Sequence, residues 1–310
     1  MGDNGQMRQR TLGSTVRCRG VGLHTGDSVT MVLRPAPSGT GIVFRRIDAG
    51  VEIPATWQHT IEMPLCTTLT NGNGVEIKTI EHLMAAFAGS AIDNAFVELD
   101  GPEVPAMDGS AAPFVALIER AGVEFLGRMR RAIKVLKPVR IDRDGATVAL
   151  LPDHGFSMSF QIAFDNPVIR QQDMMLAFEP DTFRTELSGA RSFCLFDEVE
   201  RMRAAGLARG GSLDNAVVVG ADGVLNEGGL RFPNEFVRHK LLDAFGDLYL
   251  AGGPIIGHFH GSCSGHAHTR LLLKALFADP QGWCATTLAD APMPQPATTA
   301  WPEAARLAVA

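Results

Sequence analysis

Short apolar segments separated by turn residues dominate the early part of the chain, and this pattern predicts strands. The segments in which β-branched and other apolar residues gather are residues 29–33, 42–46, 66–69 and 75–78. Proline and glycine at 35–39 mark a turn between the first two segments. Residues 71–74, Asn-Gly-Asn-Gly, connect the last two as a β-hairpin turn does. Residues 93–99 form a further expected strand.

The hydrophobic period becomes helical at residues 79–89. This segment begins with Thr79, a candidate N-cap, and ends at Gly89. Residues 110–121 predict a second helix, with Pro113 in its first turn. The same reasoning predicts later helices at residues 182–187, 197–205, 234–251 and 269–277. It predicts later strands at residues 134–141, 147–151, 158–164, 216–220 and 255–260.

Both halves of the chain show several strands, then a helix, a strand and another helix, which predicts an α+β fold. We expect two related two-layer sandwich domains, each with a mostly antiparallel sheet, helices on one face and a small insertion. The expected domains are residues 1–127 and 128–280, with a strand–helix–strand insertion at about 195–220. Residues 281–310, rich in Ala, Pro and Thr, are expected to form a weakly ordered tail.

The overall composition fits a folded protein and excludes several classes of function. Of the 310 residues, 45% are hydrophobic and 20% are charged, which argues against disorder. The formal net charge of −6 disfavours nonspecific binding to nucleic acid. The five cysteines include no Cys-x-x-Cys pair, no apolar segment is long enough to span a bilayer, and no signal peptide is recognisable. We therefore expect a soluble cytoplasmic protein.

The longest predicted helix carries three ionisable residues on one face. His239, Asp243 and Asp247 recur at i, i+4 and i+8 among apolar positions. Because buried ionisable groups are paired or bound to metal, two interpretations stay open. His239 and Asp243 either form a stabilising pair within the helix or supply two ligands to a zinc ion. Catalytic zinc sites use three protein ligands and keep one position open.

A third ligand would come from another segment. His82 follows Glu81 in the first predicted helix, where a surface or capping pair is the simpler interpretation. A carboxylate beside a ligand is nevertheless what hydrolytic zinc sites use to take a proton from water. The histidines are concentrated near the C-terminal end, where five of the nine are His239, His258, His260, His266 and His268. Each of the last four is either an ordinary buried histidine or a general acid supported by a carboxylate such as Asp247.

Three further segments combine turn residues with a reactive side chain or a helix start. Residues 21–26 present His24 in a turn between glycines, and residues 107–114 lead into a helix. Turn formation explains both, with substrate contact as the alternative. Residues 191–194 offer the hydroxyl of Ser192 as a hydrogen-bond donor. The chain contains no Gly-x-Ser-x-Gly elbow, Walker loop or Gly-x-Gly-x-x-Gly motif to support a serine hydrolase, an NTPase or a Rossmann enzyme.

Taken together, these segments resemble the UDP-3-O-acyl-N-acetylglucosamine deacetylases, the zinc amidases of lipid A biosynthesis in Gram-negative bacteria. The matching stretches are GVGLHTG (20–26), LRPAP (33–37), TIEHLMAAFAG (79–89), IDNAFVELDGPEVPAMDGSAAPF (92–114), ARSF (190–193), GGSLDNAVVVG (210–220), VLNEGGLRFPNEFVRHKLLDAFGDL (224–248) and SGHAH (264–268). They follow the order of the family from about residue 20 to residue 270. The set is far more specific than any one stretch.

The resemblance implies a catalytic zinc ion, which Fe²⁺ can replace, and a role for each residue around it. The residues that match the metal ligands are His82, His239 and Asp243. The residues that match the catalytic groups are Glu81 as general base, His266 as general acid, Asp247 as the residue that orients it, and Ser192 as oxyanion donor. The family commonly has threonine where Ser192 stands, so the hydroxyl is kept and the methyl is lost.

The resemblance also implies where the substrate binds. The residues that match contacts near the sugar and diphosphate are Leu23, His24, Leu65, Phe193 and Lys240. The residues that match an acyl-chain tunnel in the insertion are Leu195, Val199, Ala208, Ser212, Ala216 and Val218. The apolar character of this second set equally suits a packed strand–helix–strand unit. Residues 142–147 differ from the basic stretch of some members, so the uridine contacts are not assigned.

The implied activity is zinc-dependent removal of the N-acetyl group from UDP-3-O-acyl-N-acetylglucosamine, with release of acetate, as the committed step of lipid A biosynthesis. The implied partner is this small acylated UDP-sugar. Nucleic acid is excluded, contact with the inner membrane is at most peripheral, and an oligomer is not required. Two alternatives stay open. One is a binding protein that a metal stabilises, and the other is a related zinc hydrolase that acts on another acylated sugar nucleotide.

Overall fold

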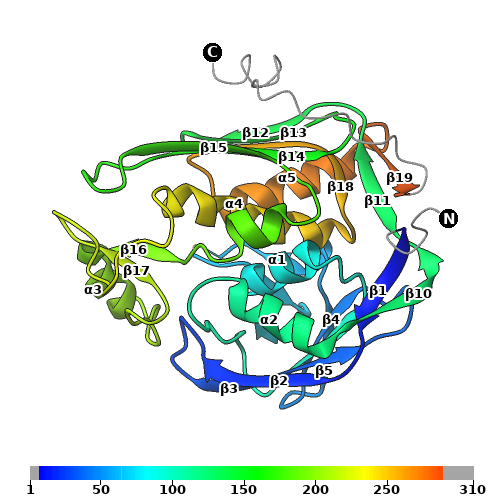
Figure 1. Ribbon diagram of the computed structural model, residues 1–310, viewed down its shortest axis with the longest axis horizontal. Helices are drawn as coiled ribbons and strands as arrows, with labels where there is room; N and C mark the ends of the chain where they lie inside the picture. The colour runs from blue at the N-terminus through cyan, green and yellow to red at the C-terminus, as the bar shows by residue number, and fades with distance from the viewer. Residues whose placement is uncertain (1–6, 64, 289–310) are drawn as a thin grey trace.

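Four helices lie between two β-sheets in the computed structural model, which describes residues 7–63 and 65–288 (Figure 1). These helices are α1 (Glu81–Gly89), α2 (Ala112–Ala121), α4 (Glu235–Leu248) and α5 (His266–Ala278). The first two face one sheet and the last two face the other, and α1 packs against α4 between them. The predicted α+β fold is confirmed, while the division at residue 127 stays a prediction.

The first sheet has five strands in the order β2–β3–β9–β4–β5. Their bounds are Val16–Val21 for β2, Ser28–Pro35 for β3, Ala95–Leu99 for β9, Ile42–Arg46 for β4 and Val51–Pro54 for β5. Neighbouring strands are antiparallel except β4 and β9, which run parallel. Burial alternates along β3, where Val29, Met31 and Leu33 face the helices. Burial alternates in the same way along β9, and such alternation is typical of strands with one face on the core.

Two small sheets flank the first sheet. The hairpin predicted around residues 71–74 is confirmed, and it joins a three-stranded sheet of β6 (Thr60–Ile61), β7 (Thr68–Thr70) and β8 (Glu76–Ile77). The Asn71 side chain accepts the backbone N–H groups of Asn73 and Val75, which holds the turn. β1 (Arg8–Leu12) pairs with β10 (Val123–Met129) in a separate ribbon. A 3₁₀ turn, η1 (Trp57–His59), precedes β6.

The second sheet has seven strands, with β18 at its centre. β18 (Ile255–Ser262) pairs antiparallel with β13 (Ala146–Leu151) and parallel with both β11 (Arg131–Val135) and β14 (Phe156–Ala163). The outer strands are β12 (Val139–Arg143), β15 (Gln171–Ala177) and β19 (Trp283–Thr287). The sheet is therefore mixed. β18 follows α4 in the chain and runs in the same direction as β11 and β14.

Two sequence predictions in this sheet were wrong. The single strand predicted at 134–141 is two strands, β11 and β12, which lie at different places in the sheet. Pro138 has no N–H group to donate to a strand ladder and lies between them. The expected tail, 281–310, begins with an ordered strand, because β19 pairs antiparallel with β11 along all five of its residues. Residues 289–310 lie outside the described residues.

The helix ends also differ from the predictions. Thr79 does not cap α1: its φ is +59°, its hydroxyl donates to Glu103, and the N-cap is Ile80 without a side-chain cap. The helix expected at 269–277 begins earlier, at His266, so this histidine belongs to the first turn of α5. The segment expected at 182–187 is one π-helical turn, η2 (Phe183–Leu187). The long helix predicted at 234–251 is α4 followed by the 3₁₀ turn η3 (Tyr249–Ala251).

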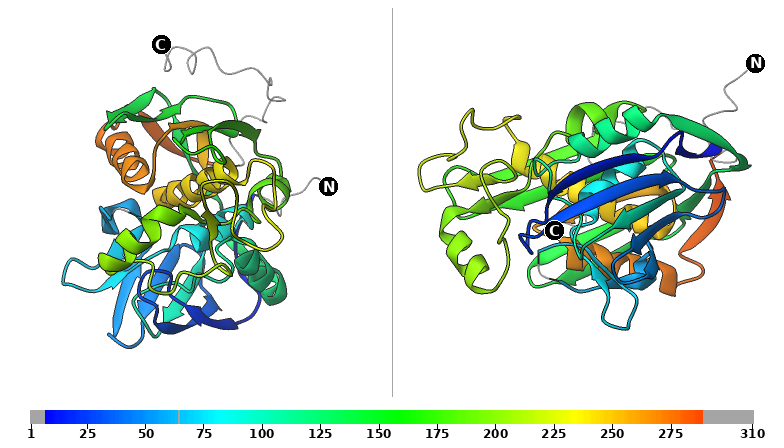
Figure 2. Two further views of the ribbon diagram at one scale, coloured as in Figure 1. Left: turned by 90° about the vertical axis from the view of Figure 1, so that its left-hand side faces the viewer. Right: turned by 90° about the horizontal axis from the view of Figure 1, so that it is seen from below.

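The predicted strand–helix–strand insertion is present beside the two layers of helices. It consists of β16 (Phe193–Leu195), α3 (Phe196–Ala204) and β17 (Val217–Val219), with the two strands parallel. Figure 1 and the right view of Figure 2 show it projecting from one side of the sandwich. In the described part of the chain no helix is long and apolar enough to cross a membrane.

Gly246 allows α1 and α4 to approach closely enough to form a site. A Cβ atom at this position would overlap the backbone carbonyl of Glu81 and touch the backbone of Ala85. The apolar residues around the contact are fully buried, among them Leu83, Leu242 and Phe87. The polar residues that the two helices contribute are therefore held face to face inside the core.

Candidate active site

Three buried side chains converge where α1 meets α4. α1 contributes His82, and α4 contributes His239 and Asp243 from successive turns. Asp243 Oδ1 lies 3.4 Å from His82 Nε2 and 3.3 Å from His239 Nε2. One nitrogen or oxygen of each of the three residues lies within 4.8 Å of the others. The pair of residues on one helix that the sequence suggested, His239 and Asp243, is therefore joined by a third side chain, His82, from a distant segment.

The donor set fits a divalent ion of the zinc type. Ligand atoms about 2.0–2.1 Å from a tetrahedral zinc ion would lie about 3.3 Å apart, which matches the two His–Asp separations. The backbone carbonyl of Ala190 lies 3.1 Å from His239 Nδ1 and directs Nε2 of the same ring toward Asp243. Burial lowers the pKa of His239 to about 4, so the ring is neutral at neutral pH, as a metal ligand must be.

Lys240 completes the surroundings of Asp243. Its Nζ donates to Asp243 Oδ2 over 2.8 Å. Burial would raise the pKa of Asp243, but the neighbouring His239 ring and the positive charge of Lys240 hold it well below its usual range. Burial likewise opposes the charge on Lys240, yet the carboxylate beside it raises the lysine pKa. The carboxylate is thus ionised and has one oxygen directed at the histidines.

Glu81 lies directly beside the three converging residues, at the first position of α1. Its Oε2 accepts the backbone N–H of Thr67 over 3.0 Å, and its Oε1 lies 3.9 Å from His266 Nε2. Burial raises the pKa of Glu81, while His266 and His82 act against that increase. A carboxyl group whose pKa is raised toward neutrality is a better proton acceptor than an ordinary glutamate.

His266 faces the same site from the N-terminus of α5. Its Nδ1 lies 2.8 Å from Asp247 Oδ2, and its Nε2 lies 4.0 Å from Asp243 Oδ2. Burial opposes the charged ring, but Asp247 and Glu81 together raise the pKa of His266 to about 9. The ring is therefore cationic at neutral pH, with Nε2–H directed at the site. Asp247 is the third residue of the predicted helix stripe and contacts this ring.

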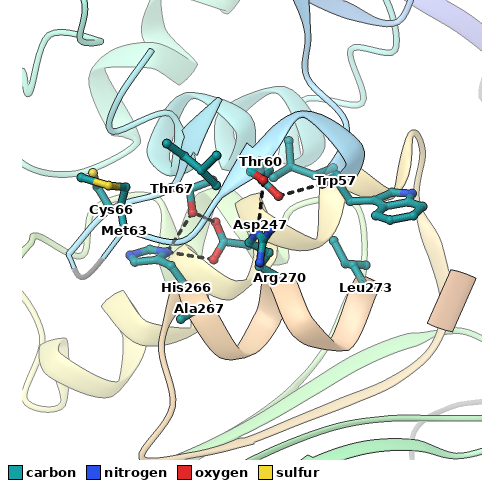
Figure 3. Close-up of a pocket in the computed structure, with 12 residues that line it drawn as sticks. Trp57, Thr60, Met63, Cys66, Thr67, Asp247, His266, Ala267, Arg270 and Leu273 are labelled. Atoms are coloured by element: carbon teal, nitrogen blue, oxygen red, sulfur yellow. Dashed lines mark hydrogen bonds and ion pairs between the residues drawn. The ribbon is translucent and has the colours of Figure 1, made fainter. Parts of the chain in front are cut away.

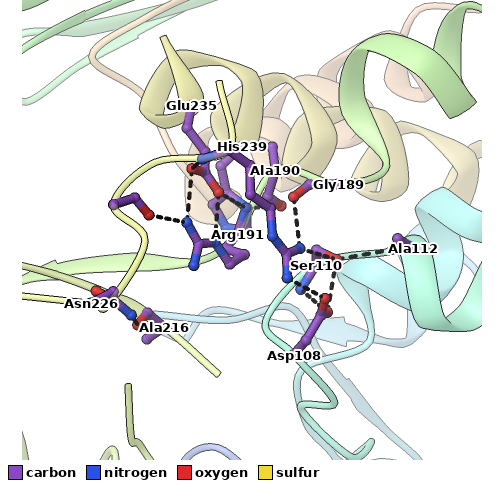
Figure 4. A network of polar contacts seen from close by, with 12 residues as sticks. Asp108, Ser110, Ala112, Gly189, Ala190, Arg191, Ala216, Asn226, Glu235 and His239 are labelled. Atoms are coloured by element: carbon purple, nitrogen blue, oxygen red, sulfur yellow. Dashed lines mark hydrogen bonds and ion pairs between the residues drawn. The ribbon is translucent and has the colours of Figure 1, made fainter. Parts of the chain in front are cut away.

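A buried network holds the segment that carries Ser192 and Phe193. Glu235, the first residue of α4, accepts the backbone N–H and the Nε–H of Arg191, and the backbone N–H of Arg231. Figure 4 shows Glu235 and Arg191 beside Ala190 and His239. The Phe193 ring lies edge-on to the His239 ring, with the centroids 6.2 Å apart. The segment is thus fixed at the start of the helix that supplies two of the three converging residues.

The turn that carries Leu23 and His24 docks on the insertion. Glu103 accepts the backbone N–H of His24 over 2.9 Å, and the N–H of Gly210 donates to the Leu23 carbonyl over 3.0 Å. The backbone N–H of Ala208 donates to His24 Nδ1 over 3.4 Å. In the described part of the chain His24 Nε2 is buried without a hydrogen-bond partner. Burial lowers the pKa of His24, so its ring is neutral.

The residues assigned to an acyl-chain tunnel differ in exposure. Ala216 is buried and Ser212 is exposed, while the other four are half-buried. Leu195 packs against the main core together with Phe193. Leu65, placed with the substrate contacts, is 43% exposed. The tunnel stays a prediction, because the same residues also form the packed face of the insertion.

The remaining histidines of the C-terminal group have partners of their own. His258 lies between Ser157 and Ser159, with its ring nitrogens 2.7 and 2.8 Å from their hydroxyls. The Ser159 hydroxyl is also 3.0 Å from His260 Nδ1. His268 Nε2 lies 3.2 Å from the carbonyl of Arg143. These contacts agree with the interpretation of all three as ordinary histidines that form hydrogen bonds with nearby groups.

Sequence reasoning missed Thr67 and the Glu235–Arg191 pair. Thr67 touches Glu81, Asp247 and His266, and it lines a pocket behind His266 together with Cys66 and Trp57 (Figure 3). Nothing in a predicted strand at 66–69 distinguishes this threonine from its neighbours. Glu235 is fully buried at a helix start, where an acidic residue ordinarily serves the helix dipole in solvent.

Two histidines and a carboxylate beside a buried glutamate and a cationic histidine form the arrangement that metal-dependent hydrolases use.

Comparison with known proteins gives the family. The UDP-3-O-acyl N-acetylglycosamine deacetylase family matches residues 9–278. A UDP-3-O-acyl-N-acetylglucosamine deacetylase of Legionella pneumophila strain Corby is 47% identical over 281 residues, which are 89% of this chain and 92% of the relative. A UDP-3-O-acyl-N-acetylglucosamine deacetylase of Chromohalobacter salexigens is 46% identical over 300 residues, which are 96% of this chain and 99% of the relative. The chain belongs to the UDP-3-O-acyl-N-acetylglucosamine deacetylase family.

Proposed function

We propose that this protein hydrolyses the N-acetyl group of UDP-3-O-acyl-N-acetylglucosamine in lipid A biosynthesis, with zinc as its cofactor. The observation that carries the proposal is the convergence of His82, His239 and Asp243 beside Glu81 and His266 in a member of this family. The names of the matching relatives supply the substrate. A cytoplasmic location and activity without an oligomer stay predictions.

The three converging side chains would hold the metal. Two imidazole nitrogens and one carboxylate oxygen suit zinc or Fe²⁺ better than Mg²⁺, which prefers oxygen ligands and keeps several waters. When bound, such an ion polarises the amide carbonyl and lowers the pKa of a water molecule. Lys240 donates to the second oxygen of Asp243 and would hold this carboxylate in place.

The side chains around this position would carry the proton transfers. As water adds to the carbonyl carbon, Glu81 takes one of its protons, and the Ser192 hydroxyl donates to the oxygen that gains negative charge. When the C–N bond breaks, Nε2–H of His266 gives its proton to the departing nitrogen. Acetate and the free amino sugar result. Asp247 keeps the other ring nitrogen of His266 oriented throughout.

The remaining assigned residues would bind the substrate. We place the sugar and diphosphate against Leu23, His24, Leu65, Phe193 and Lys240. The 3-O-acyl chain would follow the insertion along Leu195, Val199, Ala208, Ser212, Ala216 and Val218. The docking of the His24 turn on residues 208–210 supports this placement, because it joins the two sets in one wall.

Measurement of acetate release together with metal content tests the function. The purified chain is expected to release one acetate per molecule of UDP-3-O-acyl-N-acetylglucosamine and to contain one zinc ion. UDP-N-acetylglucosamine without the acyl chain serves as the competing substrate. Equal rates of acetate release from both sugars would favour the alternative of a related zinc hydrolase that acts on another acylated sugar nucleotide. Bound metal without acetate release would favour the binding protein.

The pH dependence of kcat/KM is expected to be bell-shaped. The general base must be deprotonated, so the rate rises as pH increases through the pKa of Glu81, which burial raises above its ordinary value. The general acid must be protonated, so the rate falls as pH increases through the pKa of His266, about 9. Steady-state rates measured from about pH 5 to about pH 10 with a three-component buffer check both limbs. A rate that does not fall as pH increases from about 8 to about 10 would remove His266 from the role of acid.

A further inference from the structure

Thr67 is joined through its backbone to the start of the helix that presents Glu81. Its N–H donates to Glu81 Oε2 over 3.0 Å, and its carbonyl accepts the N–H of Ile80, the N-cap of α1, over 3.3 Å. The side chain is almost completely buried, immediately before β7. Thr67 therefore cannot shift without moving the carboxylate of Glu81 with it.

The hydroxyl of Thr67 faces Asp247 and His266. It donates its single proton to Asp247 Oδ1, and its oxygen lies 3.1 Å from His266 Nδ1. A threonine hydroxyl has one proton and two lone pairs, so once that proton is given to Asp247 the oxygen can only accept from His266. Nδ1–H of the ring thus lies between two acceptors, Asp247 Oδ2 at 2.8 Å and the Thr67 oxygen.

A pocket beside Asp247 and His266 explains why the Thr67 hydroxyl is needed to hold them. Asp247, His266 and Thr67 all line it, together with Cys66, Trp57 and Arg270 (Figure 3). Open space on the side away from the three converging residues means that close packing alone does not confine the Asp247 carboxylate or the His266 ring. The Thr67 hydroxyl contacts both groups and so holds Nε2 of His266 toward Glu81 and Asp243.

We propose that Thr67 is a positioning residue that fixes the general acid, His266, relative to the general base, Glu81. The inference rests on the proposed deacetylase function. Thr67 touches neither the expected metal ligands nor the substrate directly. It acts on His266 and Asp247 through its hydroxyl, and on Glu81 through its backbone N–H, which any side chain at this position would leave in place.

The test compares Thr67→Val, Thr67→Ser and the matched control Thr68→Val. Valine keeps the shape and removes the hydroxyl, and serine keeps the hydroxyl. Thr68 is the next residue and is also buried, and its hydroxyl contacts Cys66 Sγ at 3.5 Å. Thr67→Val is expected to lower kcat for acetate release about 10- to 100-fold, as loss of outer partners does in metal sites, with KM and zinc content unchanged. Thr67→Ser is expected to restore most of kcat, and Thr68→Val to keep it.

Several outcomes would overturn the inference. One is wild-type kcat in Thr67→Val, and another is an equal loss in Thr67→Ser, which would assign the effect to the methyl group. A higher KM with unchanged kcat would assign Thr67 to substrate binding. If Thr67→Val does not fold, Thr67→Ala is measured with the same expectation, since it also keeps the backbone N–H. A wild-type chain that releases no acetate refutes the proposed function itself, whereas an active wild type with an unaffected variant refutes only the role of Thr67.

Discussion

Glu81→Gln is expected to lower kcat by ~10²–10⁴-fold, the usual contribution of a general base, while the chain still binds one zinc ion. Glutamine has nearly the same shape and can still accept the N–H of Thr67, but it cannot take a proton from water. Because Glu81 is buried at an elevated pKa, its neutral replacement removes an unfavourable charge, and the melting temperature is not expected to fall. Acetate release, metal analysis and thermal unfolding measure the three quantities.

A control for this variant is Glu52→Gln in β5. The Glu52 side chain is exposed and pairs with Arg45 at the surface, so its replacement is expected to leave both rate and metal content unchanged. A Glu81→Gln chain with the wild-type rate would show that another group takes the proton. If Glu81→Gln released acetate slowly but had also lost its metal, the result would not support a role as base. The lost activity would then arise from disturbed metal ligands.

Asp243→Ala is expected to abolish both metal binding and acetate release. The substitution removes one of the three proposed ligands and leaves the half-buried Lys240 without its carboxylate partner. Removing one partner of a buried ion pair costs about 3–5 kcal/mol, so the free energy of unfolding is also expected to decrease. Treating the wild type with a chelator should remove its activity, and added zinc should restore it. Zinc should not restore the variant.

Asp173→Ala in β15 serves as the matched control for the ligand variant. Its carboxylate is exposed and is not among the converging residues. It is expected to retain the metal, the rate and the melting temperature of the wild type. Retention of stoichiometric zinc by Asp243→Ala would refute the assignment of this carboxylate as a ligand. Activity of the wild type after complete metal removal would refute the metal-dependent mechanism as a whole.

Local sequence patterns predicted most elements around the site. The alternation in residues 29–33 and the Asn-Gly turn at 71–74 each report a local period or turn preference, and the structure has the expected strand and hairpin there. The helical spacing of His239, Asp243 and Asp247 placed these residues on one face before any fold was considered. That spacing could not separate a helix ion pair from a metal site, because both use the same two residues.

Predictions failed where distant contacts override local preference. Thr79 has the character of an N-cap, but the buried Glu103 takes its hydroxyl, and the backbone at Thr79 adopts a positive φ instead. The Ala-, Pro- and Thr-rich residues 281–310 suggested a weakly ordered tail, but β11 supplies backbone partners for β19 within it. Neither Glu103 nor β11 is near in sequence to the residue that it controls.

The sequence by itself determined most of the elements, the helix face that carries His239 and Asp243, and, through its resemblance to a known family, the roles to be tested. Only the tertiary structure brought His82 into contact with that face, because the packing of α1 on α4 depends on close approach at Gly246. Only the tertiary structure revealed Thr67 between Glu81, Asp247 and His266. Periodicity describes neighbours along one helix or strand, whereas the geometry of catalytic groups is set by the contacts between elements.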